Sequence, residues 1–395
     1  MKCITMLFVV VLLGGPGLLL ADQELSLPAY RDHLAGGFIG EMVGVCFGAP
    51  YEFRYISRIN QGELKPWRPE RIRNALRQDD LYVELTFLKS LETYGLLVSP
   101  AQVGADLAAT RFPLWHGGGQ ARRNLRRGIP PPESGHPRHN PHADDIDFQI
   151  HSDLFGLISP GLPAAAWEMG DRFGHILAFG DGVYGGIFIA TMSSQAFFES
   201  DPETLVRAGL AAIPPESRYA RTIADVLAVS ENNPEDWEAV WRMVEEKYVP
   251  LQKCRLVPVV GPKGIDANVN GAYVAAALLY GRGDPYQTLE IAVRLGKDCD
   301  CNAASAMGVL GAALGYERLP AEFKAGLEAI RDEKFLGTGY TWPRALAAME
   351  ALARTAVASQ GGQVRHPAGE EKWRIPEQEI RPARPFEVSF PPKEK

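Results

Sequence analysis

The stretch Gly296-Lys297-Asp298-Cys299-Asp300-Cys301-Asn302-Ala303-Ala304 joins two predicted helices, at 285–295 and 302–315, and the second is rich in small residues (NAASAMGVLGAALG). Asp298 and Asp300 are two residues apart, so in a loop their carboxylates can converge on one cation. In the middle of a helix the same two side chains would point well apart. The alternative is that Asp300 or Asn302 caps the second helix by accepting free amide groups. On these residues alone, capping is the better-supported alternative.

Length and charge narrow the class of protein. A chain of 395 residues can form one large domain or two ordinary ones. Its hydrophobic fraction of 46% and charged fraction of 23% are those of a soluble globular protein. The net charge of -7 gives no general attraction to nucleic acid or to an anionic membrane. We therefore expect a small-molecule or glycoconjugate substrate and no nucleic-acid partner, and the sequence does not indicate an oligomeric state.

The N-terminus has the pattern of a secretory signal. Lys2 precedes an apolar run over 4–20, which ends at Leu-Leu-Ala-Asp and predicts cleavage near Ala21. An uncleaved anchor is the alternative, but the Gly/Pro break at 14–17 and the short apolar core argue against a stable membrane span. We expect residues 1–21 to be a signal peptide and the mature protein to be exported, either periplasmic or secreted.

Cysteine usage is sparse in the expected mature chain. Without Cys3, the chain contains only Cys46, Cys254, Cys299 and Cys301, too few for a disulfide framework. Cys46 and Cys254 are expected to be buried small hydrophobic residues.

Apolar periodicity predicts an all-α fold with one domain over residues 25–358 and an extended tail over 359–395. The predicted helices cover residues 29–48, 79–95, 100–113, 163–177, 183–199, 203–212, 216–229, 234–248, 268–281, 285–295, 302–315, 320–331 and 341–357. The first has glycines at every fourth position, Gly36, Gly40, Gly44 and Gly48, which indicates close approach to other helices. In the tail, residues 386–390 have the pattern of one short strand.

Carboxylates mark the start of the helix over 79–95. Asp79 and Asp80 favour the positive end of the helix dipole. Glu84 lies one turn after Asp80 on the same side, which makes a carboxylate ladder. Considered in isolation, this ladder is interpreted as a solvated acidic edge.

A second acidic group lies in the polar, Pro-rich stretch that opens at 117–119 and is predicted to be irregular. Asp144, Asp145 and Asp147 are candidates for substrate contact, because so long a polar loop is more often functional than not. Tyr184 and Trp115 are candidate stacking groups. A weak zinc hypothesis attaches to His136, His139 and His142, whose spacing lacks a compact ligand pattern.

Three segments together resemble the ADP-ribosylglycohydrolase family, which includes ADP-ribosyl-acceptor hydrolases and dinitrogenase-reductase-activating glycohydrolases. They are GGFIGEMVGVCFGAPYEF at 36–53, QDDLYVELTFLKSLETYG at 78–95, and the run from Asn268 to Pro320. The resemblance covers about a third of the chain and includes the most specific family motifs. It implies a compact multi-helix bundle with a binuclear magnesium cleft, and hydrolysis at C1 of the distal ribose of ADP-ribose.

The resemblance also implies roles for individual residues. Asp79 and Asp80 match the Thr-Asp-Asp metal motif of the family, and Asp298 and Asp300 match its Asp-x-Asp-Thr motif. Glu52 matches a glutamate that lies at the metal cleft in relatives. The implied metal ligands are Asp79, Asp80, Asp298 and Asp300, and the implied catalytic residues are Glu52, Asp80 and Asp300.

Some positions depart from the family pattern. Gln78, Leu81 and Cys301 stand where relatives usually have threonine, and Lys297 stands where they have glycine. Cys301 is a poor donor for magnesium, which prefers oxygen. The Lys297 ammonium could occupy the place of one cation. We therefore expect one or two Mg²⁺ ions, with Mn²⁺ or Ca²⁺ as alternatives.

These residues predict a divergent, exported, metal-dependent hydrolase of an N- or O-glycosidic bond in ADP-ribose or a related nucleoside or sugar glycoside. Such a reaction needs activated water, leaving-group protonation and anchored sugar hydroxyls. The alternative is a non-catalytic exported protein that binds a sugar or nucleotide on the same fold. The losses of threonine favour that alternative, and the retained carboxylates oppose it.

Overall fold

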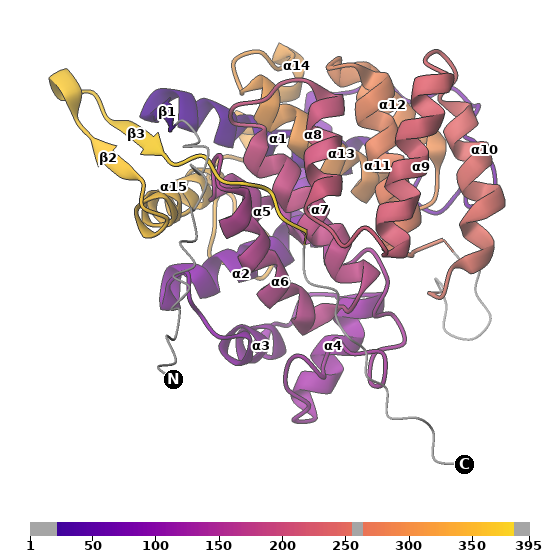
Figure 1. Cartoon of the computed structure of the whole chain (residues 1–395), viewed down its shortest axis with the longest axis horizontal. Coiled ribbons are helices and arrows are strands. Elements are labelled where there is room, and N and C mark those ends of the chain that lie inside the picture. The colour runs from indigo at the N-terminus through magenta and orange to yellow at the C-terminus, as the bar shows by residue number, and fades with distance from the viewer. Residues whose placement is uncertain (1–21, 255–263, 383–395) are drawn as a thin grey trace, which may run out of the picture.

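The computed structural model describes residues 22–254 and 264–382, and over these the predicted all-α class is confirmed (Figure 1). The helices are α1 (Leu27–Gly48), α2 (Asp79–Tyr94), α3 (Pro100–Ala109), α4 (His116–Arg126), α5 (Asp153–Leu157), α6 (Pro163–Leu177), α7 (Asp181–Gln195), α8 (Pro202–Ala211), α9 (Arg218–Asn232), α10 (Glu238–Lys247), α11 (Ala267–Gly281), α12 (Pro285–Leu295), α13 (Cys299–Leu314), α14 (Ala321–Lys324) and α15 (Trp342–Ser359). A 3-10 helix over Pro69–Arg77 precedes α2. The signal peptide expected over 1–21 lies outside the described residues.

Helices α1 and α13 pack antiparallel with their backbones in contact. A Cβ at Gly36, Gly40 or Gly44 would overlap the carbonyl oxygens of Gly311, Met307 and Ala303 respectively, and one at Gly48 would overlap the backbone of Asp300. Glycine is required at these positions because no side chain fits between the two backbones. The predicted close approach of the glycine-rich helix is thus confirmed, and it brings the end of α1 to the start of α13.

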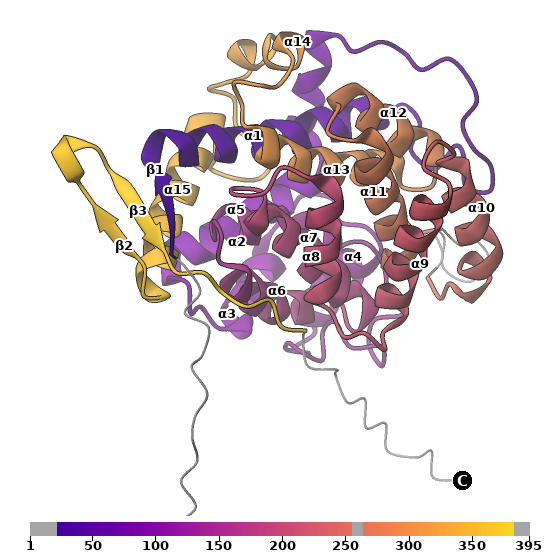
Figure 2. The same cartoon turned by 45° about the horizontal axis from the view of Figure 1, so that its top comes forward.

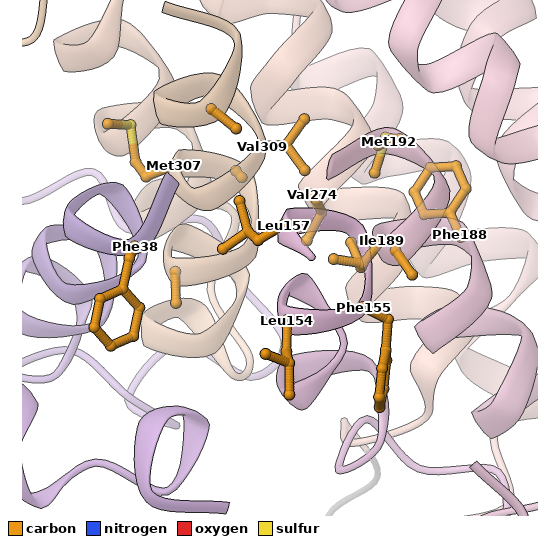
Figure 3. Packing of buried hydrophobic residues seen from close by; sticks show 14 of the residues in the cluster. Phe38, Leu154, Phe155, Leu157, Phe188, Ile189, Met192, Val274, Met307 and Val309 are labelled. Atoms are coloured by element: carbon orange, nitrogen blue, oxygen red, sulfur yellow. The ribbon is translucent and has the colours of Figure 1, made fainter. Parts of the chain in front are cut away.

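A single large hydrophobic core fills the space around this pair. Figure 3 shows Phe38 of α1, Leu154 of α5, Ile189 of α7, Val274 of α11 and Met307 of α13 within one packed cluster, and all are fully buried. The central helices α7, α11 and α13 are buried on nearly every face, which explains why their sequences are apolar throughout.

The two ends of the described chain meet in a small antiparallel sheet beside α15 (Figures 1 and 2). Its order is β1 (Gln23–Ser26), β3 (Lys372–Ile375), β2 (Gln363–Arg365), and Trp373 is fully buried beneath it. After β3 the chain runs over the surface, where Gln378 Oε1 accepts a hydrogen bond from the Ala164 amide at 3.0 Å. The first part of the predicted tail therefore forms paired strands. The strand expected over 386–390 lies outside the described residues.

None of the helices in the described ranges is long and apolar enough to cross a membrane. Cys46, Cys254, Cys299 and Cys301 are buried free thiols, which confirms the burial predicted for Cys46 and Cys254.

Candidate active site

A cavity of about 660 Å³ opens where the end of α1 meets the starts of α2, α4 and α13. Its lining comprises Glu52, Phe53, Arg77, Gln78, Asp79, Tyr82, Pro113, Trp115, His116, Asp147, Ile150, Asp298, Asp300 and Cys301. Three helix N-termini at one cavity favour negative charge there, because the positive ends of their dipoles are close together. The close α1–α13 contact is what brings Glu52 to the same cavity as Asp298 and Asp300.

The first turn of α2 contributes Asp79 and Asp80. Asp79 is half-buried and lines the cavity, and Asp80 is fully buried behind it. The Cys301 thiol donates to Asp80 Oδ2 at 3.5 Å, while Asp80 Oδ1 has no hydrogen-bond partner. A buried carboxylate oxygen without a partner is costly unless a proton or a cation satisfies it.

The start of α13 contributes Asp298 and Asp300. The helix begins at Cys299, so Asp298 occupies the N-cap position and Asp300 lies in the first turn rather than in a loop. The Asp298 side chain makes no capping hydrogen bond, and Asp300 Oδ1 is buried without a partner. Capping by Asp300 or Asn302, the alternative that the local sequence favoured, is therefore wrong, because both residues lie inside the helix.

The electrostatics of this group fit a hard divalent cation. Burial raises the pKa of each of Asp80, Asp298 and Asp300 well above its ordinary value, and nearby carboxylates, with Asp79 acting on all three, raise it further. Burial and then the Asp147 charge raise the pKa of Asp79 to about 6. None of the four forms an ion pair with a basic side chain of the described chain. Converging carboxylate oxygens are the donors that Mg²⁺, Mn²⁺ and Ca²⁺ prefer.

Glu52 follows α1 at the mouth of the cavity. The residue as a whole is exposed, although its carboxylate lies in the cavity wall, where partial burial and the Asp79 charge raise its pKa. Its loop is fixed to the start of α13, because the Phe53 amide donates to Lys297 O at 2.9 Å and the Lys297 amide donates to Tyr55 O at 3.0 Å.

Lys297 does not replace a cation, contrary to the hypothesis drawn from the sequence. Its buried ammonium donates to Ile56 O at 2.6 Å and pairs with Glu245 of α10 at 2.5 Å, outside the cavity lining. The backbone φ of Lys297 is 59°, a left-handed conformation that favours glycine. The Lys297 side chain is thus directed away from the cavity, and its buried ammonium is satisfied by Ile56 O and Glu245.

Of the second acidic group, the structure brings Asp147 to the cavity and places Asp145 directly behind it. Asp145 Oδ2 accepts from the Gly117 amide at 2.6 Å, and Asp147 Oδ2 accepts from the Gly118 amide. These bonds satisfy free amides at the start of α4. Residues 116–126, predicted to be irregular because of three consecutive glycines, therefore form a helix whose glycines leave room for the two carboxylates.

Two other residues that the sequence suggested for substrate contact, Asp144 and Tyr184, lie away from the cavity. Asp144 Oδ2 accepts from Lys253 Nζ at 2.7 Å, and its Oδ1 lies 3.9 Å from the Arg218 guanidinium. Tyr184 is buried in α7. Neither belongs to the cavity lining, whereas Trp115 does and is 59% exposed there.

Sequence reasoning missed several lining residues, above all His116, Phe53, Arg77 and Tyr82. The signal that could have indicated His116 is its position immediately before the glycines that receive Asp145 and Asp147. Phe53 adjoins Glu52, and Tyr82 follows Asp79 at helical spacing.

A further group of carboxylates lies in the core. Glu41 of α1, Glu84 of α2 and Asp153 of α5 are almost completely buried. Burial raises the pKa of all three, and the pKa of Asp153 reaches about 7. The interpretation of Glu84 as part of a solvated acidic edge is therefore wrong, because α2 turns that face into the protein.

The chain is similar to known proteins. The ADP-ribosylglycohydrolase family model matches residues 26–361. A solved structure titled "ADP-ribosylglycohydrolase-related protein complex" is similar to 84% of this chain and 100% of its own, with 18% sequence identity and a TM-score of 0.48. No curated protein sequence matches the chain.

Proposed function

Because this chain belongs to the ADP-ribosylglycohydrolase family, we propose that it is a metal-dependent hydrolase of an N- or O-glycosidic bond at an anomeric carbon. Membership supports a glycohydrolase-type function. The proposed substrates are ADP-ribose conjugates or related nucleoside or sugar glycosides. The observation that carries the proposal is the position of Asp79, Asp298 and Asp300 in the lining of one cavity with the fully buried Asp80 behind them, where Asp80 Oδ1 and Asp300 Oδ1 are buried and unpartnered.

These four aspartates would hold one or two Mg²⁺ ions, and Mn²⁺ or Ca²⁺ would suit the same oxygen donors. When bound, such a cation supplies an anchor for vicinal sugar hydroxyls and lowers the pKa of a coordinated water. Cys301 is a soft donor that suits neither Mg²⁺ nor Ca²⁺. Its thiol instead donates to Asp80 Oδ2 and so helps to orient that carboxylate.

The side chains of the chain itself can serve the other needs of the reaction. Glu52, at the cavity mouth with a raised pKa, is placed to accept a proton from water or to act as a further ligand. Asp80 and Asp300, the other residues expected to be catalytic, would act through the cation that they hold. Trp115 offers an exposed aromatic face for a sugar or base.

The expected signal peptide makes export part of the proposal. Protein ADP-ribosylation is chiefly intracellular, so a nucleoside-like or carbohydrate glycoside found outside the cytoplasm is a rival to ADP-ribose conjugates as the substrate class. The second candidate function is metal-independent binding of a sugar or nucleotide without catalysis. It is favoured by Gln78, Leu81 and Cys301, which remove the threonine hydroxyls that the family motifs provide.

The test is hydrolysis of a panel of ADP-ribosyl, nucleoside and sugar glycosides by the mature protein, with Mg²⁺ and with chelator. We expect Mg²⁺-dependent turnover, and a kcat/KM lowered by about 100-fold or more in Glu52→Gln, since general-base catalysis contributes 10² to 10⁴. Glu63→Gln, an exposed glutamate outside this cavity, is the matched control. Binding of a panel member without turnover in any metal would instead support the non-catalytic function.

A further inference from the structure

We propose that the α4 side of the cavity contains a second metal site of different chemistry, which binds one transition-metal ion such as Zn²⁺ through His116, His142, Asp145 and Asp147. The site is distinct from the oxygen-only group of Asp79, Asp80, Asp298 and Asp300. The proposal does not depend on the proposed hydrolysis, because it concerns metal binding alone.

The first support is convergence. One ligand atom from each of His116, Asp145 and Asp147 lies within 4.8 Å of the other two. Bonds from zinc to nitrogen or oxygen are about 2.0–2.2 Å, so a tetrahedral ion holds its ligand atoms roughly 3.5 Å apart. Small side-chain rotations therefore suffice to close the group on an ion.

The second, independent support is a buried imidazole. His142 is 6% exposed, its Nδ1 has no hydrogen-bond partner, and that atom lies 3.8 Å from Asp145 Oδ2. The rings of His142 and His116 lie 5.5 Å apart between centroids. A buried nitrogen without a partner costs free energy that a metal bond would recover.

The third support is a rigid outer shell. The amides of Gly117 and Gly118 donate to Asp145 Oδ2 and Asp147 Oδ2, and the Asp147 amide donates to Asp145 Oδ1 at 3.1 Å. A carboxylate has about four acceptor positions, so these bonds orient the two groups and leave positions for an ion. Helix capping alone explains the two aspartates, but it does not explain the unpartnered Nδ1 of His142.

Ligand type distinguishes the two sites. Imidazole nitrogen favours zinc and similar borderline ions, whereas carboxylate oxygens without nitrogen favour magnesium and calcium. The protein should therefore retain a zinc site when the α2–α13 carboxylates are disabled, and excess Mg²⁺ should not displace the zinc.

The test is calorimetric titration of Zn²⁺ into tag-free, metal-free mature protein that carries Asp298→Asn/Asp300→Asn, in parallel with Co²⁺ followed by its visible absorption. We expect one equivalent to bind, with no thiolate-to-cobalt band. His116→Gln and His142→Gln should each weaken binding at least tenfold. His366→Gln, an exposed histidine outside the cavity lining, should leave it unchanged.

The proposal would be overturned if His116→Gln and His142→Gln both left the zinc affinity unchanged. A thiolate-to-cobalt band that Cys301→Ser abolishes would also overturn it, because the ion would then be bound through Cys301 at the start of α13 and not through the histidines. Should His142→Gln fail to fold, judged by its melting curve, the half-buried His116 still decides the result through His116→Gln.

Discussion

The molecule contains two groups of buried carboxylates that share helix α2 but differ in access. Asp80 belongs to the cavity group, and Glu84, one turn later, belongs to the core group with Glu41 and Asp153. Burial raises the pKa in both groups. Asp79, Asp298 and Asp300 line the cavity, whereas Glu41, Glu84 and Asp153 do not. Ligand atoms of Asp298, Asp300 and Cys301 are close enough together to hold an ion. Among the described residues, no such group includes a carboxylate of the core group.

Burial of carboxylates therefore does not by itself indicate a metal site. Charge repulsion and desolvation can be relieved in two ways, by a cation or by protons. The cavity group is open to an exchanging cation, and we propose that a metal ion binds there. The core group is enclosed by α1, α2 and α5, and burial raises the pKa of all three carboxyls, which favours relief of the repulsion by protons.

The largest change in Mg²⁺ affinity is expected when carboxylates are removed from the cavity group and not when they are removed from the core group. In Asp298→Asn/Asp300→Asn, we expect Mg²⁺ affinity to fall at least about 100-fold, or about 2.7 kcal/mol, because two proposed ligand carboxylates are lost. In Glu41→Gln/Glu84→Gln, which removes as many carboxylates from the core, the affinity should stay within about threefold. Calorimetry with Mg²⁺ measures both. Equal losses in the two variants would remove the distinction.

The next effect concerns the helix contact that positions both groups. Gly44→Ala would press a methyl group against Ala303 O, and we expect it to lower the free energy of unfolding by about 2 kcal/mol. It should also weaken Mg²⁺ binding, since the start of α13 would shift. Urea unfolding and calorimetry measure these quantities.

The matched control is Gly170→Ala in α6, where the new Cβ would lie 3.5 Å from Ile187. Alanine is the better helix former by about 1 kcal/mol, so this variant should be unchanged or slightly more stable. A comparable destabilisation in Gly170→Ala would show that the Gly44 effect is not specific to the α1–α13 contact.

The smallest effect is a pH dependence of the core group. The Asp153 carboxyl has an ordinary pKa of 3.8 and a folded pKa of about 7. Between these values the folded state retains a proton that the unfolded state has released, so this group lowers stability as pH rises through that window. Below it both states are protonated, and the group contributes nothing.

Asp153→Asn should therefore raise the free energy of unfolding by about 1–2 kcal/mol at pH 8 and leave it nearly unchanged near pH 4, with Mg²⁺ kept saturating. The amide oxygen can still accept the bond that Ser193 donates to Asp153 Oδ1 at 3.2 Å. Urea unfolding at the two pH values is the measurement. The same loss of stability at both values would show that Asp153 serves as a charged hydrogen-bond acceptor instead.

Much of the fold follows from the sequence because local signals and the tertiary structure agree. The glycine period of α1 predicted its close packing, and the helices predicted to start at 100, 203 and 285 begin at Pro100, Pro202 and Pro285. Helix α4 was missed because three consecutive glycines disfavour a helix locally, and here the Asp145 and Asp147 carboxylates override that preference.

The site was only partly predictable for a related reason. Motif matching found Glu52 and the four aspartates that the cavity brings together, but periodicity cannot show which carboxylates face a cavity and which face the core. Glu84 was thus interpreted as solvated and Asp144 as a cavity residue. The direction of Lys297 depends on Glu245, more than fifty residues away along the chain, and no local pattern reports such a contact.

The most direct test of the central claim is calorimetric titration of ADP-ribose into the mature protein, with Mg²⁺ and with chelator. We expect ADP-ribose to bind only in the presence of Mg²⁺ and not to bind to Asp298→Asn/Asp300→Asn. Mg²⁺ binding without ADP-ribose binding would keep the metal centre and direct the substrate search to extracellular glycosides. If neither Mg²⁺ nor ADP-ribose binds, the cavity carboxylates do not form a metal-dependent active site, and the claim is contradicted.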